Sequence, residues 1–148
     1  MLKCDAGWNK VPPRKFLGGS MSDVLEADFQ HKLLLISVNR TWDKPGLDRY
    51  DAVRYSWVIS RRRAEGADYV LAVKHGLIVG AFEAEEWLPP TDDEFSKIPA
   101  NHRNLDRQHG RLGFRGHPAS DEIGRMYVGK RVPGGYRHHQ NPIRYVGV

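Results

Sequence analysis

Two apolar runs joined by a short glycine-containing turn constrain this chain more than any other feature. Residues 69–73 (Tyr-Val-Leu-Ala-Val) and 77–82 (Leu-Ile-Val-Gly-Ala-Phe) are rich in strand-forming residues, and Lys74-His75-Gly76 lies between them. Because glycine tolerates a left-handed backbone, these three residues fit a tight turn between antiparallel strands. The segment therefore predicts a β-hairpin, which must bury its apolar side chains against further strands or helices.

The residues before the hairpin predict a strand and a helix. Residues 32–38 (Lys-Leu-Leu-Leu-Ile-Ser-Val) form an apolar run of strand length, which is typical of a buried central strand. Residues 47–65 place Tyr50, Val53 and Trp57 at three- and four-residue spacing, which predicts an amphipathic helix that ends near Gly66.

The residues after the hairpin predict a loop followed by three short elements. Residues 83–110 are acidic and then polar and contain three prolines, so we expect a long surface excursion there. Residues 111–116 predict a short strand, residues 120–127 a short helix with Ser120 as its N-cap, and residues 143–146 a closing strand. This order favours a small α+β domain with a curved, largely antiparallel sheet.

A length of 148 residues fits one domain, which we place at residues 32–148. Residues 1–31 are expected to form a peripheral N-terminal extension, because prolines and glycines break any regular element there. Met21 directly follows one of these breaks, and we hypothesise that the native chain starts at this residue.

The composition indicates a reducing compartment. Cys4 is the single cysteine, so the chain forms no internal disulfide and no cysteine-based zinc site, and we expect a cytoplasmic location. The sequence has no apolar run of about 18 residues and no apolar core of a signal peptide near its start. We therefore expect no membrane partner.

The charge is positive overall and unevenly distributed. The formal net charge is +5 and the sequence pI is about 9.5. Residues 32–80 and 101–148 each carry nine Lys or Arg, against five and three acids, whereas residues 81–100 carry one Lys and six acids. This pattern suits a polyanionic partner such as RNA or DNA, and it equally suits a chain whose charge serves only solubility.

No catalytic centre, metal-ligand set or cofactor motif is recognisable. The chain lacks a phosphate-binding glycine loop, a nucleophile elbow and the histidine or cysteine spacings of zinc sites. The string from Pro90 to Glu94, followed by Lys97, is similar to the acidic core of metal-dependent nucleases, but its spacing fits a solvated acidic loop better.

Aromatic and polar side chains gather on both sides of the predicted helix start. Asn39, Arg40 and Trp42 follow the first strand, and Tyr55 and Trp57 lie on the predicted helix. Aromatic rings can stack on bases, an amide can bond to a base edge, and arginine can hold phosphate. Trp57 also fits plain core packing. The run of arginines at 61–63 fits either phosphate contacts or a solvated helix end.

Several strings together resemble a known pattern. Residues 63–73, 76–82, 111–116 and 141–146, together with Trp57, are similar to a core shared by small uncharacterised bacterial proteins. The hairpin also resembles the PUA-like superfamily, which includes the PUA, ASCH, EVE and YTH domains. The resemblance covers roughly residues 32–148.

This resemblance implies a small β-barrel flanked by helices, which binds nucleic acid or a modified base flipped into an aromatic pocket. It implies two sets of site residues. The pocket residues would be Asn39, Trp42, Tyr55 and Trp57, and the backbone contacts would be Arg40, Arg61 and Arg63.

Two other functions stay open. A small hydrolase or nuclease would need acids and a lysine that converge in one cleft. A protein-interaction domain would use the acidic residues 83–100 as its docking surface.

Overall fold

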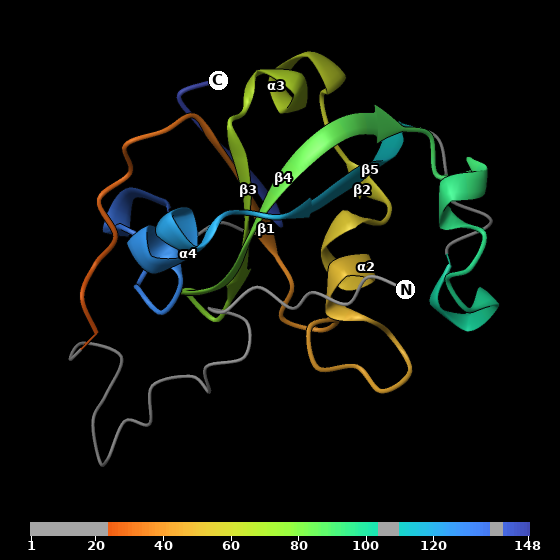
Figure 1. Ribbon diagram of the computed structural model, residues 1–148, viewed down its shortest axis with the longest axis horizontal. Coiled ribbons are helices and arrows are strands. Elements are labelled where there is room, and N and C mark those ends of the chain that lie inside the picture. The colour runs from red at the N-terminus through yellow and green to blue at the C-terminus, as the bar shows by residue number, and fades with distance from the viewer. Residues whose placement is uncertain (1–23, 104–109, 137–140) are drawn as a thin grey trace.

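Strand β4 (Leu77–Leu88) is the longest element of the computed structural model, which describes residues 24–103, 110–136 and 141–148. Its first half pairs with β3 (Tyr69–Lys74) and its second half pairs with β5 (Arg111–Pro118), both antiparallel. In Figure 1, β4 sweeps across the whole molecule. The two partners lie on opposite edges of β4 and are staggered along it, and a bulge between Ala84 and Glu86 bends the strand.

The other strands complete a mixed sheet of six. Strand β1 (Leu33–Ser37) runs parallel to β3, β6 (Ile143–Val146) pairs with β1, and the two-residue strand β2 (Trp57–Val58) pairs with β5. The order is β2-β5-β4-β3-β1-β6, and only the β1–β3 pair is parallel. The sheet is nearly closed into a barrel with three flanking helices, which confirms the predicted fold class.

The seam of this barrel lies between β2 and β6, and side chains bridge it. The backbone N–H of Ser60, just after β2, donates to the Tyr145 hydroxyl at 3.0 Å. The Arg63 guanidinium lies 3.7 Å from the centre of the Tyr145 ring and donates twice to the Val148 carbonyl. Arg63 belongs to helix α3 (Arg61–Gly66), so this helix ties the C-terminal residues to the rest of the barrel.

The predicted helix over residues 47–65 is wrong, because two short helices and a strand occupy that segment. Helix α2 (Arg49–Arg54) ends at Tyr55, Ser56 adopts a positive φ of 65°, and β2 follows. The Ser60 side chain then caps α3 by accepting from the Arg63 N–H. Helical spacing of apolar residues is a weak local preference, and pairing of Trp57 and Val58 with β5 outweighs it.

The predicted excursion over residues 83–110 is also wrong in its first part. Strand β4 continues to Leu88, with Trp87 buried on one side and Glu83, Glu85 and Glu86 exposed on the other. Single-turn 3₁₀ helices follow at Asp93–Phe95 and Ala100–His102. Acidic residues do not indicate a loop here, because they lie on the solvent side of a strand whose other side is buried.

The remaining predictions of local structure are confirmed. The hairpin, the central strand and the closing strand all form, although the turn is two residues long, with His75 and Gly76 both at positive φ. Ser120 caps helix α4 (Asp121–Tyr127) by accepting from the Ile123 N–H. Among the described residues, no helix has both the length and the apolar character that crossing a bilayer requires.

The predictions for Cys4 and Met21 concern residues outside those that the structure describes. Residues 24–31, which the sequence predicts to be peripheral, run beside α4 and bury Val24 and Ala27. The buried Tyr127 of α4 fixes this segment, because its hydroxyl accepts from the Gln30 N–H at 3.0 Å and lies 2.6 Å from His31 Nδ1.

Gly116 gives a direct test of how closely β4 and β5 approach. A Cβ atom at this position would lie 2.0 Å from the Glu83 carbonyl oxygen, a backbone atom that cannot move aside cheaply. We expect Gly116→Ala to destabilise the fold by about 3 kcal/mol, the upper end of ordinary overpacking. Gly134→Ala is the control, because nothing lies within 4 Å of its added Cβ. Urea unfolding of both variants measures the difference, and equal midpoints would contradict the packing described here.

We expect the buried phenol of Tyr127 to lower the free energy of unfolding at alkaline pH. Burial raises the pKa of this phenol above its ordinary value of about 10. The folded chain therefore keeps the proton at pH values where the unfolded chain has lost it. The stabilisation is complete below about pH 10 and is lost as the pH rises through the folded-state pKa. Tyr127→Phe should show a shallower fall in unfolding free energy above pH 10 than the parent, whereas parallel curves would refute the assignment.

Candidate functional site

The junction between α2 and β2 combines a strained backbone with unpaired polar atoms. Ser56 is one of two described residues other than glycine with positive φ, and it is 4% exposed. Such a conformation costs roughly 1–3 kcal/mol and persists only where the surroundings enforce it. Because strain of this kind gathers at functional sites, the junction is the first place to look for one.

The polar atoms around Ser56 make the junction more unusual. The Ser56 hydroxyl, the neighbouring Tyr55 hydroxyl and Arg103 Nε are shielded from solvent, and each lacks a hydrogen-bond partner among the residues that the structure describes. A buried polar group without a partner costs about 1–3 kcal/mol. Native structures contain few of these, so the three, which are among seven such atoms in the described residues, add to the case for a site at this junction.

Two arginines bring positive charge to the same place. Arg111 Nη1 donates to the Ser56 carbonyl at 2.8 Å. Burial raises the pKa of the Tyr55 phenol, and the positive charges of Arg103 and Arg111 act against that rise. Both guanidinium groups are therefore close enough to Tyr55 to act on it electrostatically. We use the name junction site for Tyr55, Ser56, Trp57, Arg103 and Arg111.

Trp57 gives the junction site its aromatic surface. The residue is half-buried in β2, and its indole N–H donates to the Val53 carbonyl at 2.6 Å. With its N–H already used inside the protein, the exposed part of the indole can offer a partner only ring contact. Its neighbour Val58 is 63% exposed, so this short strand meets solvent.

A buried arginine, Arg54, links the end of α2 to the segment that follows β4. Arg54, the last residue of α2, pairs with Asp51 at 2.7 Å and with Glu94 at 2.8 Å. Its guanidinium lies 4.6 Å from the centre of the Tyr50 ring and 4.9 Å from that of Phe95. These contacts fasten the segment after β4 to the end of α2, where Phe95 packs edge-on against Tyr55.

The predicted pocket residues are divided between two places. Tyr55 and Trp57 flank Ser56 at the junction site. Trp42 is 4% exposed and packs over Gly80, and the Asn39 side chain accepts the His75 N–H at 2.8 Å. Asn39 and Trp42 therefore support the β3–β4 hairpin.

The predicted backbone contacts are divided in the same way. Arg40 is exposed beside the hairpin turn. Arg61 donates to the Trp87 carbonyl at 2.7 Å and lies 3.8 Å from Glu65, and Arg63 is used at the barrel seam. Both helix arginines thus make contacts that hold the fold together. Sequence reasoning missed Ser56, Arg103 and Arg111, because no residue type signals a positive φ at a serine.

Two other places are weaker candidates for a site. A shallow groove of about 330 Å³ lies between α3 and β4, but its charged residues Glu85 and Glu86 already pair with Arg115. In the nuclease-like string, Asp92 caps a 3₁₀ helix and Glu94 pairs with Arg54. Within the described parts of the chain, no three His, Cys, Asp or Glu side chains gather as a metal site would require.

Ser56 offers a test of strain at the junction. Ser56→Gly removes both the unfavourable φ and the unpaired hydroxyl, so we expect it to raise the free energy of unfolding by about 1 kcal/mol or more, despite the flexibility that glycine adds to the unfolded chain. Ser56→Ala removes only the hydroxyl and should stabilise less. Urea titration of the three proteins checks the order, and a variant less stable than the parent would contradict it.

Comparison with known proteins found no match to this chain among protein families, curated proteins or solved structures.

Proposed function

We propose that this protein is a PUA-like nucleic-acid-binding module that holds a single base, unstacked or modified, at the junction site. The observation that carries the proposal is the partly exposed Trp57 in the short edge strand β2, next to the strained Ser56 and the cation Arg111. An aromatic ring beside a cation is the pairing that proteins use to stack a base and hold its phosphate.

The chemistry of the junction suits a base better than an aliphatic ligand. Stacking on an aromatic ring contributes about 1–3 kcal/mol per base. The Tyr55 and Ser56 hydroxyls are buried beside this surface, so they support the shape of the site and leave direct contact with a base to Trp57 and the arginines. Arg111 and Arg103 supply positive charge for a phosphate.

The overall charge supports a polyanionic partner. A net charge of +5 draws nucleic acid toward the protein and makes binding depend on salt. We infer a cytoplasmic location from the single cysteine, because proteins of oxidising compartments more often carry paired cysteines.

Substitution of Trp57 tests the proposal. We expect Trp57→Ala to weaken binding to single-stranded RNA or DNA by about 1–3 kcal/mol, roughly 5- to 150-fold, because the stacking surface is removed. Trp57→Phe keeps a ring and should retain most of the affinity. The measurement is fluorescence anisotropy with labelled single- and double-stranded oligonucleotides, with and without common modified bases, at two salt concentrations.

Val58→Ala is the matched control, because Val58 lies in the same short strand and its side chain is largely exposed without a ring. Its affinity should equal that of the parent. Thermal unfolding of each variant separates loss of binding from loss of fold. If Trp57→Ala binds every oligonucleotide as tightly as the parent does, the junction site is not where a base binds.

A further inference from the structure

The β3–β4 turn is held at one end of the barrel between two other segments. On one side, the His75 N–H donates to Asn39. On the other side, the Ile78 N–H donates to the Lys130 carbonyl at 2.9 Å, and the Val132 N–H donates to the Gly76 carbonyl at 2.8 Å. Three stretches that are far apart in the sequence therefore meet at this turn.

These stretches carry an excess of positive charge. We use the name turn-end surface for six side chains that surround the turn: Arg40, Lys44, Lys74, His75, Lys130 and Arg131. Arg40, Lys44 and His75 are exposed, and the other three are partly exposed.

Two acids, Asp43 and Glu26, lie among the six side chains of the turn-end surface. A hydrogen bond from Lys74 and another from Arg49 hold the pKa of Asp43 below its usual range. This carboxylate is therefore negatively charged and offsets part of the positive charge of Lys74. Glu26 lies 3.7 Å from the Arg131 guanidinium. Five Lys or Arg against two acids leave the surface positive at neutral pH.

The turn-end surface and the junction site lie at opposite ends of β4. The turn precedes Leu77. At the other end of β4, Leu88 pairs with Gly113 of β5, and the preceding β5 residues Leu112 and Arg111 pair with β2. Strand β4 has twelve residues, and at roughly 3.3 Å per residue its two ends lie well beyond the reach of an ion pair or a hydrogen bond. Cations at the turn end therefore cannot act on a base at the junction directly, although both places can contact one extended nucleic acid.

The turn-end surface has the chemistry of phosphate contacts and lacks that of base recognition. Lysine and arginine side chains hold phosphate through charge and N–H donors, which carries no sequence information. Trp42 lies two residues from Arg40 and from Lys44, and Tyr127 lies three residues from Lys130, but both rings are buried, packed against Gly80 and Phe29 respectively. Arg61 and Arg63, the other predicted phosphate contacts, are used in holding the fold.

We propose that the turn-end surface binds the phosphate backbone of the nucleic acid whose base the junction site holds. This inference rests on the proposed function. It assigns affinity without sequence preference to one end of β4 and base recognition to the other.

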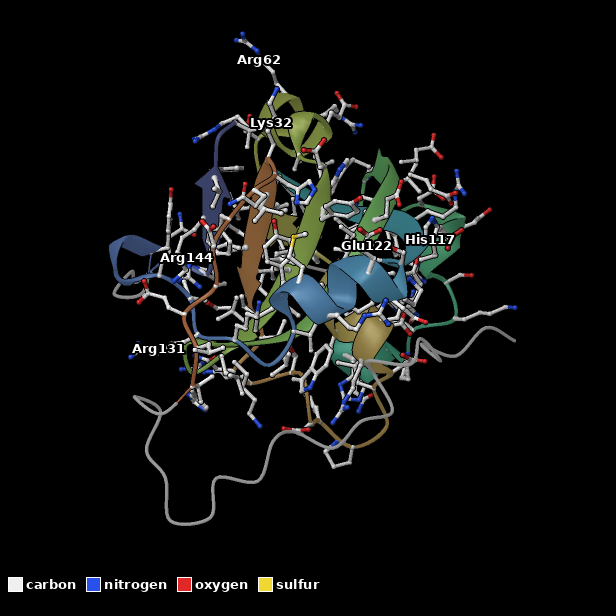
Figure 2. The ribbon with its side chains drawn as sticks, turned by 60° about the vertical axis from the view of Figure 1, so that its left-hand side comes forward. Lys32, Arg62, His117, Glu122, Arg131 and Arg144 are labelled. Atoms are coloured by element: carbon white, nitrogen blue, oxygen red, sulfur yellow. The ribbon has the colours of Figure 1, made fainter. Side chains whose placement is uncertain are left out.

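The test compares two double variants in which the same amount of positive charge is removed. Lys130→Ala/Arg131→Ala removes two cations from the turn end. Lys32→Ala/Arg62→Ala removes two from the opposite end, where both side chains are exposed; Figure 2 shows Lys32 and Arg62 near the top and Arg131 near the bottom. Affinity for a single-stranded oligonucleotide is measured by anisotropy at several salt concentrations. Each cation that no longer binds a phosphate should reduce the slope of log affinity against log salt by about 0.7.

We expect a smaller salt slope for Lys130→Ala/Arg131→Ala than for the parent, and an unchanged slope for the control Lys32→Ala/Arg62→Ala. Both variants should keep the parent's preference among bases. Arg40→Ala/Lys44→Ala, which changes only exposed side chains, should reduce the slope as well and shows that the effect does not come from altered packing of Arg131. Equal slopes in all variants, with the Trp57-dependent base preference intact, would overturn this inference and leave the proposed function standing. A parent that binds no oligonucleotide even at low salt would overturn both.

Discussion

Strand β4 pairs with β3 along its first half and with β5 along its second half, and the rest of the structure depends on this arrangement. A single shift in register between Ala84 and Glu86 bends the strand. At that point Gly116, which has no side chain, allows β5 to lie close to the Glu83 backbone. A bulge of this kind bends its strand and increases the local twist, which curls the sheet. The curl brings β2 near β6, so the seam at Tyr145 can close.

The curvature also creates the junction site. Strand β5 extends beyond Leu88, and the two residues of β2 add to its far end. Helix α2 must stop and reverse direction to reach that position, and Ser56 makes the reversal with a positive φ. Arg54 fixes the end of α2 relative to the segment after β4, because it pairs with Glu94 and lies over the Phe95 ring. The strain at Ser56 is thus a local consequence of where the curved sheet ends, and the unpaired hydroxyls lie at the same place.

Much of the fold could be predicted from the sequence, whereas the site could be predicted only in part. The strand at residues 33–37, the hairpin and the Ser120 cap follow from apolar runs, turn chemistry and capping, which are all properties of neighbouring residues. Aromatic rings made Tyr55 and Trp57 candidates, and both lie at the junction. Trp42 was a candidate for the same reason, yet its ring packs over Gly80, because burial depends on partners that are distant in the sequence.

The sequence by itself determined β1, β3, β5, β6 and the first half of β4, their largely antiparallel pairing and the positive charge of the chain, because hydrophobic pattern and composition act locally or as sums. The tertiary structure alone decided that residues 47–65 form two helices and a strand, since only pairing with β5 makes a strand at Trp57 favourable. It also decided which arginines hold the fold and which remain exposed. Arg63 meets Tyr145 and Val148 across the seam, whereas Arg40 is exposed and Arg131 partly exposed near the turn, where three distant segments meet. No local pattern encodes those contacts, because they exist only after the sheet has curved.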